Sequence, residues 1–293
     1  MLYSNPMIVG VDFSGAKADN ATWVTRAERE GSGLRILSCQ PMRRAELTEL
    51  LASLSGDTVA ALDFPFSVPQ EFAQHWEPSA HEMPSLWRAA SQMEYEEFLA
   101  IRDAFCAERG EPMRRGDLYF PECYSCLHKF NPNMVPMTFR GMQMLHQLWN
   151  AGCRVPPLDD AGRSGPLLLE SMPGAVINSF GLPHKGYKNG QRQNQLREEV
   201  LGGLSERSGV PIVNLYDFRQ QCLESHDCLD SLVAAVAAAL WARGPAGFRR
   251  PGDTPDGPPT DRRRKASPAA MAMPELEAAR LEGWIYAPYP IHI

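Results

Sequence analysis

The chain has 293 residues, 44% of them hydrophobic, and a formal net charge of −6, so it can bury a substantial core but does not attract nucleic acid through overall positive charge. Seven irregularly spaced cysteines exclude the disulfide framework of a small secreted protein. The longest apolar run, residues 231–241, is too short to span a bilayer, and residues 1–13 do not form a signal peptide, so we expect no membrane span and a cytoplasmic location.

The first part of the chain predicts three strands, a helix and a fourth strand. Short apolar runs separated by Gly and polar turns occupy residues 7–12, 21–26 and 34–39. Leucines between residues 43 and 54 repeat with helical spacing, and residues 58–64 form another apolar run. This β-β-β-α-β order predicts an α/β fold with an antiparallel start, in which two strands run to an aspartate, Asp12 and Asp63.

The middle of the chain has a different pattern. Residues 84–109 are predicted to be helical, whereas residues 110–157 are rich in Pro, Met, aromatic and Cys residues and show weak periodicity. We therefore expect residues 69–165 to form an α-rich insertion or lid after the fourth strand. An apolar run at residues 165–170 then predicts a buried strand that ends in Glu170.

The last part of the chain predicts two helices, a linker and a docking segment. Residues 191–207 form a charged helical stretch, and residues 227–241 form the most apolar helix of the chain. Residues 244–274 are dominated by Pro, Gly, Arg and Asp, which is typical of a linker or surface loop. The aromatic segment 282–288 is expected to pack back on the core. We expect residues 1–293 to form one domain with these additions.

Five carboxylates stand out by their positions. Asp12, Asp63 and Glu170 each end an apolar strand, and Asp227 and Asp230 lie in the first turn of an apolar helix. Ligands of open α/β sheets collect beyond the carboxyl ends of strands, and helical residues three apart share a face. Any one of these acids has an ordinary alternative role in a cap or a surface turn. As a group they favour one acidic site.

Carboxylates packed together repel one another unless a cation neutralises them, and hard oxygen ligands suit Mg²⁺ or Mn²⁺. Two such ions can activate water and stabilise the leaving oxygen of a phosphodiester. The sequence therefore predicts a metal-dependent nuclease that works by a two-metal carboxylate mechanism, with nucleic acid as its partner. The predicted ligands and catalytic residues are Asp12, Asp63, Glu170, Asp227 and Asp230.

Five segments in this order carry a resemblance to a known family. They are Gly10–Gly15, Ala61–Phe66, Glu170–Pro173, His226–Ala235 and Glu282–Pro288. The chain resembles the predicted ribonuclease H-like nucleases grouped as domain of unknown function 429. The resemblance implies a ribonuclease H-like mixed sheet flanked by helices, with Asp12 on the first strand, Asp63 on the fourth and the final aspartate pair placed as in RuvC-like resolvases. The nuclease activity of that family is itself inferred from fold and acidic residues.

The turn after the first strand offers a second function. A strand followed by a Ser/Gly turn offers backbone N–H groups to a phosphate, and Ser14 and Lys17 of this turn are candidate phosphate-binding residues. This segment also resembles the first phosphate loop of actin-like kinases, so an ATP-dependent phosphotransferase is an alternative, although a second Gly-rich loop is missing. A plain tight turn is the other interpretation.

Two further features have competing interpretations. Lys185 and Lys188 belong to a basic stretch that contains an aromatic residue, which suits a nucleic-acid backbone but equally suits a solvated helix face. Cys123, Cys126 and His128 have the spacing of half a zinc site but lack a second pair. A non-catalytic binding or regulatory protein is the third functional alternative.

Overall fold

Five strands form one mixed sheet in the computed structural model, which describes residues 6–129, 133–253, 257–259, 262 and 271–290. The strands are β1 (Met7–Asp12), β2 (Trp23–Glu30), β3 (Gly33–Pro41), β4 (Val59–Asp63) and β5 (Leu167–Glu170). Their order across the sheet is β3-β2-β1-β4-β5, and β2 pairs antiparallel with both of its neighbours. The strands β1, β4 and β5 are parallel, so their carboxyl ends meet at one edge of the sheet.

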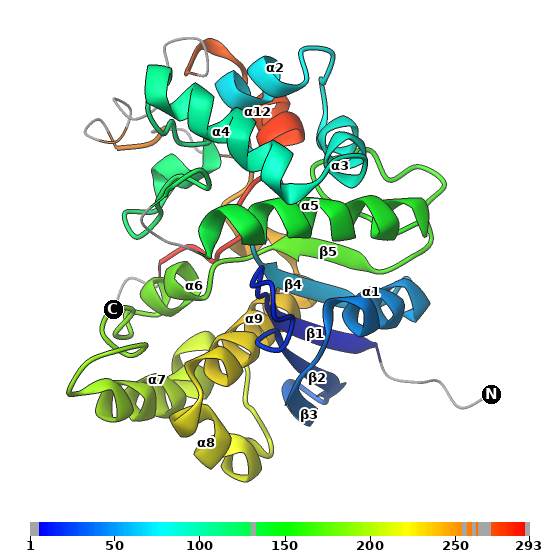
Figure 1. The fold of residues 1–293 in the computed structure, drawn as a ribbon. Helices are drawn as coiled ribbons and strands as arrows, with labels where there is room; N and C mark the ends of the chain where they lie inside the picture. The colour runs from blue at the N-terminus through cyan, green and yellow to red at the C-terminus, as the bar shows by residue number, and fades with distance from the viewer. Residues whose placement is uncertain (1–5, 130–132, 254–256, 260–261, 263–270, 291–293) are drawn as a thin grey trace.

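Helices cover both faces of the sheet (Figure 1). The apolar helix α9 (His226–Arg243) packs on β1, β2 and β4, with α6 (Pro173–Ser179), α7 (Gln193–Ser208) and α8 (Leu215–Glu224) beside it. The opposite face carries α1 (Arg44–Ser53) and α5 (Met134–Asn150). Two hydrophobic clusters, one on each side of the sheet, result from this layering.

Four further helices of the described chain lie beyond α5, namely α2 (Gln70–Trp76), α3 (Met83–Ser91), α4 (Tyr95–Arg109) and α12 (Glu275–Glu282). Two short 3-10 turns are η1 (Gly116–Tyr119) and η2 (Pro245–Gly247), and η2 packs on α9. Helices α3 and α4 pack on α5, and α12 packs on α2 and α3 (Figure 1). The chain from α2 to α5 thus separates β4 from β5 in sequence and forms an outer helical layer.

The early strand and helix predictions are confirmed, since β1 to β4 and α1 lie where the apolar runs indicated. The predicted helix over 84–109 is two helices, because the chain turns at residues 92–94 between α3 and α4. Within residues 110–157, where the weak periodicity placed no particular helix, the structure has a long one. It is α5, whose Pro136 is tolerated in the first helical turn and whose Gly141 faces the ring of Phe64.

The segment after α9 returns to the core. Residues Trp284 to Ala287 are buried, and the backbone N–H of Tyr286 donates to the carbonyl of Glu170 at 2.9 Å. This agrees with the expected docking of the aromatic segment. Arg262 is buried and donates to the carbonyls of Pro121 and Cys123 at 3.0 and 3.1 Å, so it is a structural arginine. The three basic residues that follow it in the predicted linker, residues 263–265, lie outside the described residues.

Across the part of the chain that the structure describes, no helix combines the length and the apolar character needed to cross a bilayer.

The closest packing in the core joins β1 to α9. A Cβ atom added at Gly10 would lie 2.0 Å from the carbonyl oxygen of Ser231 and 2.2 Å from the amide nitrogen of Ala235. Both atoms are helix backbone, which cannot swing away as a side chain does. The distance between strand and helix therefore depends on glycine at this position.

We expect Gly10→Ala to destabilise the protein by about 3 kcal/mol or more, because the added methyl group overpacks a backbone contact. Urea denaturation of the purified variant measures this free energy. Gly202→Ala is the matched control, since residue 202 is exposed within α7 with nothing near its would-be Cβ, and should raise the stability by up to about 1 kcal/mol. Equal effects of the two changes would contradict the packing argument.

Candidate acidic site

Two of the predicted acids are direct neighbours in the sheet. Asp12 of β1 and Asp63 of β4 are paired in the parallel register. Residues in register on adjacent strands point to the same face, and successive residues of a strand alternate between faces. Ile8 of β1 packs in the cluster on the α9 side and Val11 in the opposite cluster, so Asp12 points toward α9.

Helix α9 supplies the third acid. Asp230 is fully buried, and its carboxylate comes together with those of Asp12 and Asp63 so that one oxygen of each lies within 4.8 Å of the others. The phenol of Tyr187 donates to Asp230 Oδ1 at 2.8 Å, and Lys188 Nζ lies 2.6 Å from Asp230 Oδ2. We call Asp12, Asp63 and Asp230 the acidic triad.

Burial dominates the electrostatics of the triad. It raises the pKa of Asp12 well above the usual range, and the charges of Asp230 and Asp63 raise it further. Burial also raises the pKa of Asp63 to about 7, although the charge of Lys188 opposes the shift. Without a bound cation these carboxyl groups therefore hold protons more tightly than exposed aspartates do.

Asp227 lies beside the triad. Burial is the largest single effect and raises its pKa, but the hydrogen bond and charge of His226, together with Asp12 and Lys188, lower it, so the net direction is down. His226 Nδ1 is 2.6 Å from Asp227 Oδ1, and the Asp227 carboxyl also shares a hydrogen bond with Asp12. Asp227 thus stays ionised next to Asp12 and forms a pair with a histidine.

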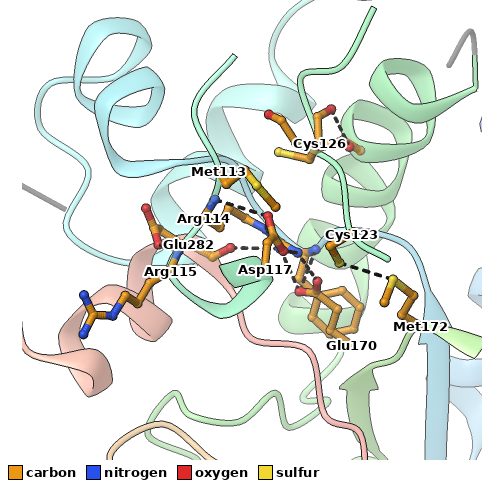
Figure 2. Close-up of polar contacts among 12 residues, drawn as sticks. Met113, Arg114, Arg115, Asp117, Cys123, Cys126, Glu170, Met172 and Glu282 are labelled. Carbon is orange, nitrogen blue, oxygen red and sulfur yellow. Dashed lines mark hydrogen bonds and ion pairs between the residues drawn. The ribbon is translucent and has the colours of Figure 1, made fainter. Parts of the chain in front are cut away.

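Glu170 does not join the triad. It pairs in register with Leu62, one residue before Asp63, so the alternation of the pleat turns its side chain away from α9. Both of its carboxylate oxygens accept from Arg114 (Figure 2). Its Oε2 also accepts from the backbone N–H of Phe66 at 3.0 Å. Glu170 was predicted to be a metal ligand, but in the structure its carboxylate oxygens are already bound by protein donors and lie outside the triad.

Arg114 is the centre of a second charged cluster that local sequence patterns did not indicate. Its guanidinium binds Asp117 at 2.7 Å as well as Glu170, and all three side chains are almost completely buried (Figure 2). Arg114 also donates to the carbonyl of Glu282 at 3.0 Å. Asp117 is a local partner three residues away, but Glu170 and Glu282 are 56 and 168 residues away, so only the fold brings these two to Arg114.

Glu282 ties the C-terminal segment to this cluster. Its fully buried carboxylate accepts from the backbone N–H groups of Gln70 at 2.7 Å and Arg115 at 2.6 Å. Burial raises its pKa to about 7. Gly283 adopts φ +79°, and a Cβ there would lie 2.7 Å from Glu170 Oε2, which explains why a glycine follows Glu282.

A cleft of about 780 Å³ runs along the edge where β1, β4 and β5 end. Asp12, Asp63, Asp227 and Glu170 line it together with apolar side chains such as Phe13, Phe64, Met134, Met137 and Met172. Ser171 also lines the cleft, and its hydroxyl has no hydrogen-bond partner among the described residues although the residue is only 3% exposed. Buried hydroxyls are seldom left in this state, which points to a ligand in the cleft.

The turn after β1 is built mainly for packing. The N–H of Ser14 donates to Thr22 Oγ1 at 3.0 Å, and the Ser14 hydroxyl accepts from the N–H of Ala16 at 3.2 Å. A Cβ at Gly15 would lie 2.2 Å from the Met137 amide nitrogen of α5. Ser14 lines the cleft, whereas Lys17 is exposed and does not. These contacts favour a structural turn over a phosphate-binding loop.

The two candidate lysines separate in the structure. Lys185 is exposed and lies outside the cleft lining, whereas Lys188 lines the cleft and pairs with Asp230. Arg197, from the same basic stretch, is buried and donates to the carbonyls of Tyr187 and Lys188 at 2.7 and 3.0 Å. This arginine therefore fixes the lysine segment rather than offering a surface to nucleic acid.

The cysteine spacing does not give a metal site in the described chain. The Cys123 thiol contacts the sulfur of Met172 at 3.3 Å, and His128 Nδ1 lies 2.6 Å from Glu111 Oε2 (Figure 2 shows the Cys123 contact). Of the described residues, only the acidic triad gathers three or more potential ligand atoms. Burial raises the pKa of Cys123 and of Cys126, so both thiols stay protonated.

The model of a protein family described as "Protein of unknown function (DUF429)" matches residues 10–256. No curated protein and no solved structure is similar enough to the chain to count as a match.

Arg114→Met should destabilise the protein by about 3–5 kcal/mol, because it leaves the buried carboxylates of Asp117 and Glu170 without their counter-charge. Urea denaturation measures the change. Arg109→Met removes an exposed guanidinium at the end of α4 and should cost less than about 0.5 kcal/mol. If the two variants were equally stable, the buried cluster would not contribute as its geometry indicates.

The metal-free protein should lose thermal stability as the pH rises from about 4.5 to 7.5. The folded-state pKa of Asp63 and of Glu282 is about 7, above the unfolded value of roughly 4. Between these values the folded state binds more protons, so its stability falls as pH rises. Differential scanning calorimetry with a chelator should show a flatter pH dependence for Asp63→Asn, and the wild-type dependence for the exposed-site variant Asp57→Asn. A melting temperature that rises over this range would refute the assignment.

Proposed function

The chain belongs to the DUF429 family of proteins of unknown function, and we propose that it is a metal-dependent phosphodiesterase that hydrolyses nucleic acid on a ribonuclease H-like fold. The observation that carries the proposal is the convergence of three carboxylates from β1, β4 and α9 within 4.8 Å. Acids so close together and so poorly solvated require a cation to be ionised together.

The topology supports the fold part of the proposal. The five-stranded mixed sheet flanked by helices, and the acids at the ends of β1 and β4, agree with what the family resemblance implies for a ribonuclease H-like protein. The aspartates of α9 agree with the acidic pair that the resemblance implies near the end of such a core.

The donor set fits a hard divalent cation. Asp12, Asp63 and Asp230 would hold Mg²⁺ or Mn²⁺ through oxygen atoms alone, and the unpartnered Ser171 hydroxyl lies in the same cleft. Such an ion supplies a Lewis acid that polarises a phosphodiester and lowers the pKa of water. The remaining chemistry belongs to the side chains around it.

His226 and Asp227 form a proton-handling pair at the rim of the triad. The contact between Nδ1 and Asp227 orients the imidazole and leaves Nε2 as the nitrogen that accepts or donates a proton. Both residues line the cleft, so the pair faces the place where a phosphodiester would bind. Lys188 neutralises part of the negative charge that would otherwise repel that phosphate.

The cleft suits a short stretch of nucleic acid. Its volume of about 780 Å³ is that of a site for a small ligand, such as a nucleotide with its flanking phosphates. Tyr124 at the cleft is 66% exposed and stacks on His128, so it offers an aromatic face on which a base could stack. Together with the acidic net charge, this favours a single strand or a strand end over long duplex.

Labelled single-stranded, duplex, hybrid and junction substrates incubated with Mg²⁺ or Mn²⁺ test the proposal. We expect cleavage of a substrate with a single-stranded portion, at least a hundredfold loss with Asp12→Asn, and none with a chelator. The matched control is Asp57→Asn, which removes the charge of an exposed aspartate at the opposite end of β4 and should retain full activity.

Cleavage that survives equally in Asp12→Asn would come from a contaminant or another site. The absence of cleavage on every substrate, from a folded protein that binds either ion, would refute the nuclease proposal and favour a binding or regulatory role.

A further inference from the structure

Lys188 already gives the acidic triad one positive charge. Its Nζ lies 2.6 Å from Asp230 Oδ2, and the Asp230 carboxylate is fully buried. The other carboxylate oxygen of Asp230 accepts from the Tyr187 hydroxyl at 2.8 Å. Asp230 therefore has both a counter-charge and a neutral donor from adjacent residues of one segment.

The position of Lys188 is fixed by buried contacts. Arg197, which is 4% exposed, donates to the carbonyl oxygens of Tyr187 and Lys188 and, at 2.7 Å, to that of Leu223 near the end of α8. One guanidinium thus joins the lysine segment to the chain that leads directly into α9. The fold therefore holds the backbone of Lys188 beside α9, and its side chain, which is 46% exposed, reaches Asp230 from the cleft.

The charges of the site balance with a single divalent ion. The three carboxylates of the triad carry three negative charges when ionised, and one ammonium group with one divalent ion neutralises them. A second divalent ion would leave the triad with excess positive charge and would compete with Lys188 for Asp230. Asp227 is left out of this count because its carboxylate is not one of the three that gather within 4.8 Å, and it contacts His226 Nδ1 at 2.6 Å instead.

A separate observation indicates that the cleft takes a ligand at this place. Ser171 follows the last residue of β5 and lines the cleft. It is only 3% exposed, yet its hydroxyl has no hydrogen-bond partner among the described residues. An unpaired hydroxyl at such a position costs free energy unless a ligand or water satisfies it.

We propose that the ammonium group of Lys188 takes the place of the second metal ion, so that the acidic site binds one divalent cation rather than the two predicted from the sequence. The inference rests on the proposed function, since it concerns the same metal site. It assigns Lys188 as a positioning residue that sets the number of ions through its ion pair with Asp230.

Titration of the full-length protein with Mn²⁺, followed by equilibrium dialysis and by electron paramagnetic resonance, tests the proposal without relying on catalysis. Wild type should bind one equivalent of Mn²⁺ with the spectrum of an isolated ion. Lys188→Met should bind a second equivalent, with the spectral broadening of two neighbouring ions. Lys188→Arg keeps the charge, and Lys185→Met removes an exposed charge of the same loop, so both should bind one equivalent.

Two equivalents in wild type would overturn the inference while leaving the metal-dependent function intact, as would one equivalent in a folded Lys188→Met protein. Failure of wild type to bind Mn²⁺ at all would refute the proposed function together with the inference. The wild-type measurement alone tests the proposal even if Lys188→Met does not fold.

Discussion

The contact between the backbone of α9 and Gly10 of β1 is the constraint on which the acidic site depends. It brings the first turns of the helix against the strand, so that Asp230 reaches Asp12 from the adjacent layer. The parallel register of β1 and β4 then adds Asp63. A larger residue at position 10 would separate the two layers, and the three carboxylates would no longer share one point.

This closeness has an electrostatic cost that the surroundings offset. Burial of Asp12 and Asp63 favours their neutral forms, and repulsion from Asp230 adds to the effect. Lys188 and Tyr187 contact the carboxylate oxygens of Asp230, and His226 helps to lower the pKa of Asp227. The protein thus keeps part of the site ionised by its own contacts and leaves the remainder dependent on a cation.

The succession of strands and helices along the chain, and the placement of four acids at strand ends or on an apolar helix, followed from local patterns, because apolar runs and helical spacing are properties of neighbouring residues. Glu170 shows that such patterns do not predict the face of the sheet to which a side chain points. Asp12, Asp63 and Glu170 look equivalent in the sequence, but a register offset of one residue turns Glu170 to the other face, where Arg114 binds it. Register between distant strands is set by tertiary packing.

The basic partners of the acids could not be predicted from the sequence either. Arg114 meets Glu170, and Lys188 meets Asp230, only after distant segments have packed together, and an arginine or lysine in a loop carries no local sign of its partner. The helix α5 was missed for another reason. Its Pro136 and Gly141 are usual signs of irregular chain, but a first-turn proline and a glycine packed on Phe64 suit this helix.

The contacts of Glu282 also bear on how the molecule is completed during synthesis. The N-terminal part of a chain is synthesised first. Residues 70 and 115 therefore emerge from the ribosome long before Glu282, whose carboxylate accepts their backbone N–H groups. Until residue 282 follows, Gln70 and Arg115 lack this acceptor, and Arg114 lacks the carbonyl beside its two acidic partners. The wall of the cleft that contains Arg114 therefore gains its last contacts late in translation. A chain that ends before residue 282 has the acids of β1, β4 and α9 but lacks these contacts of the cleft wall.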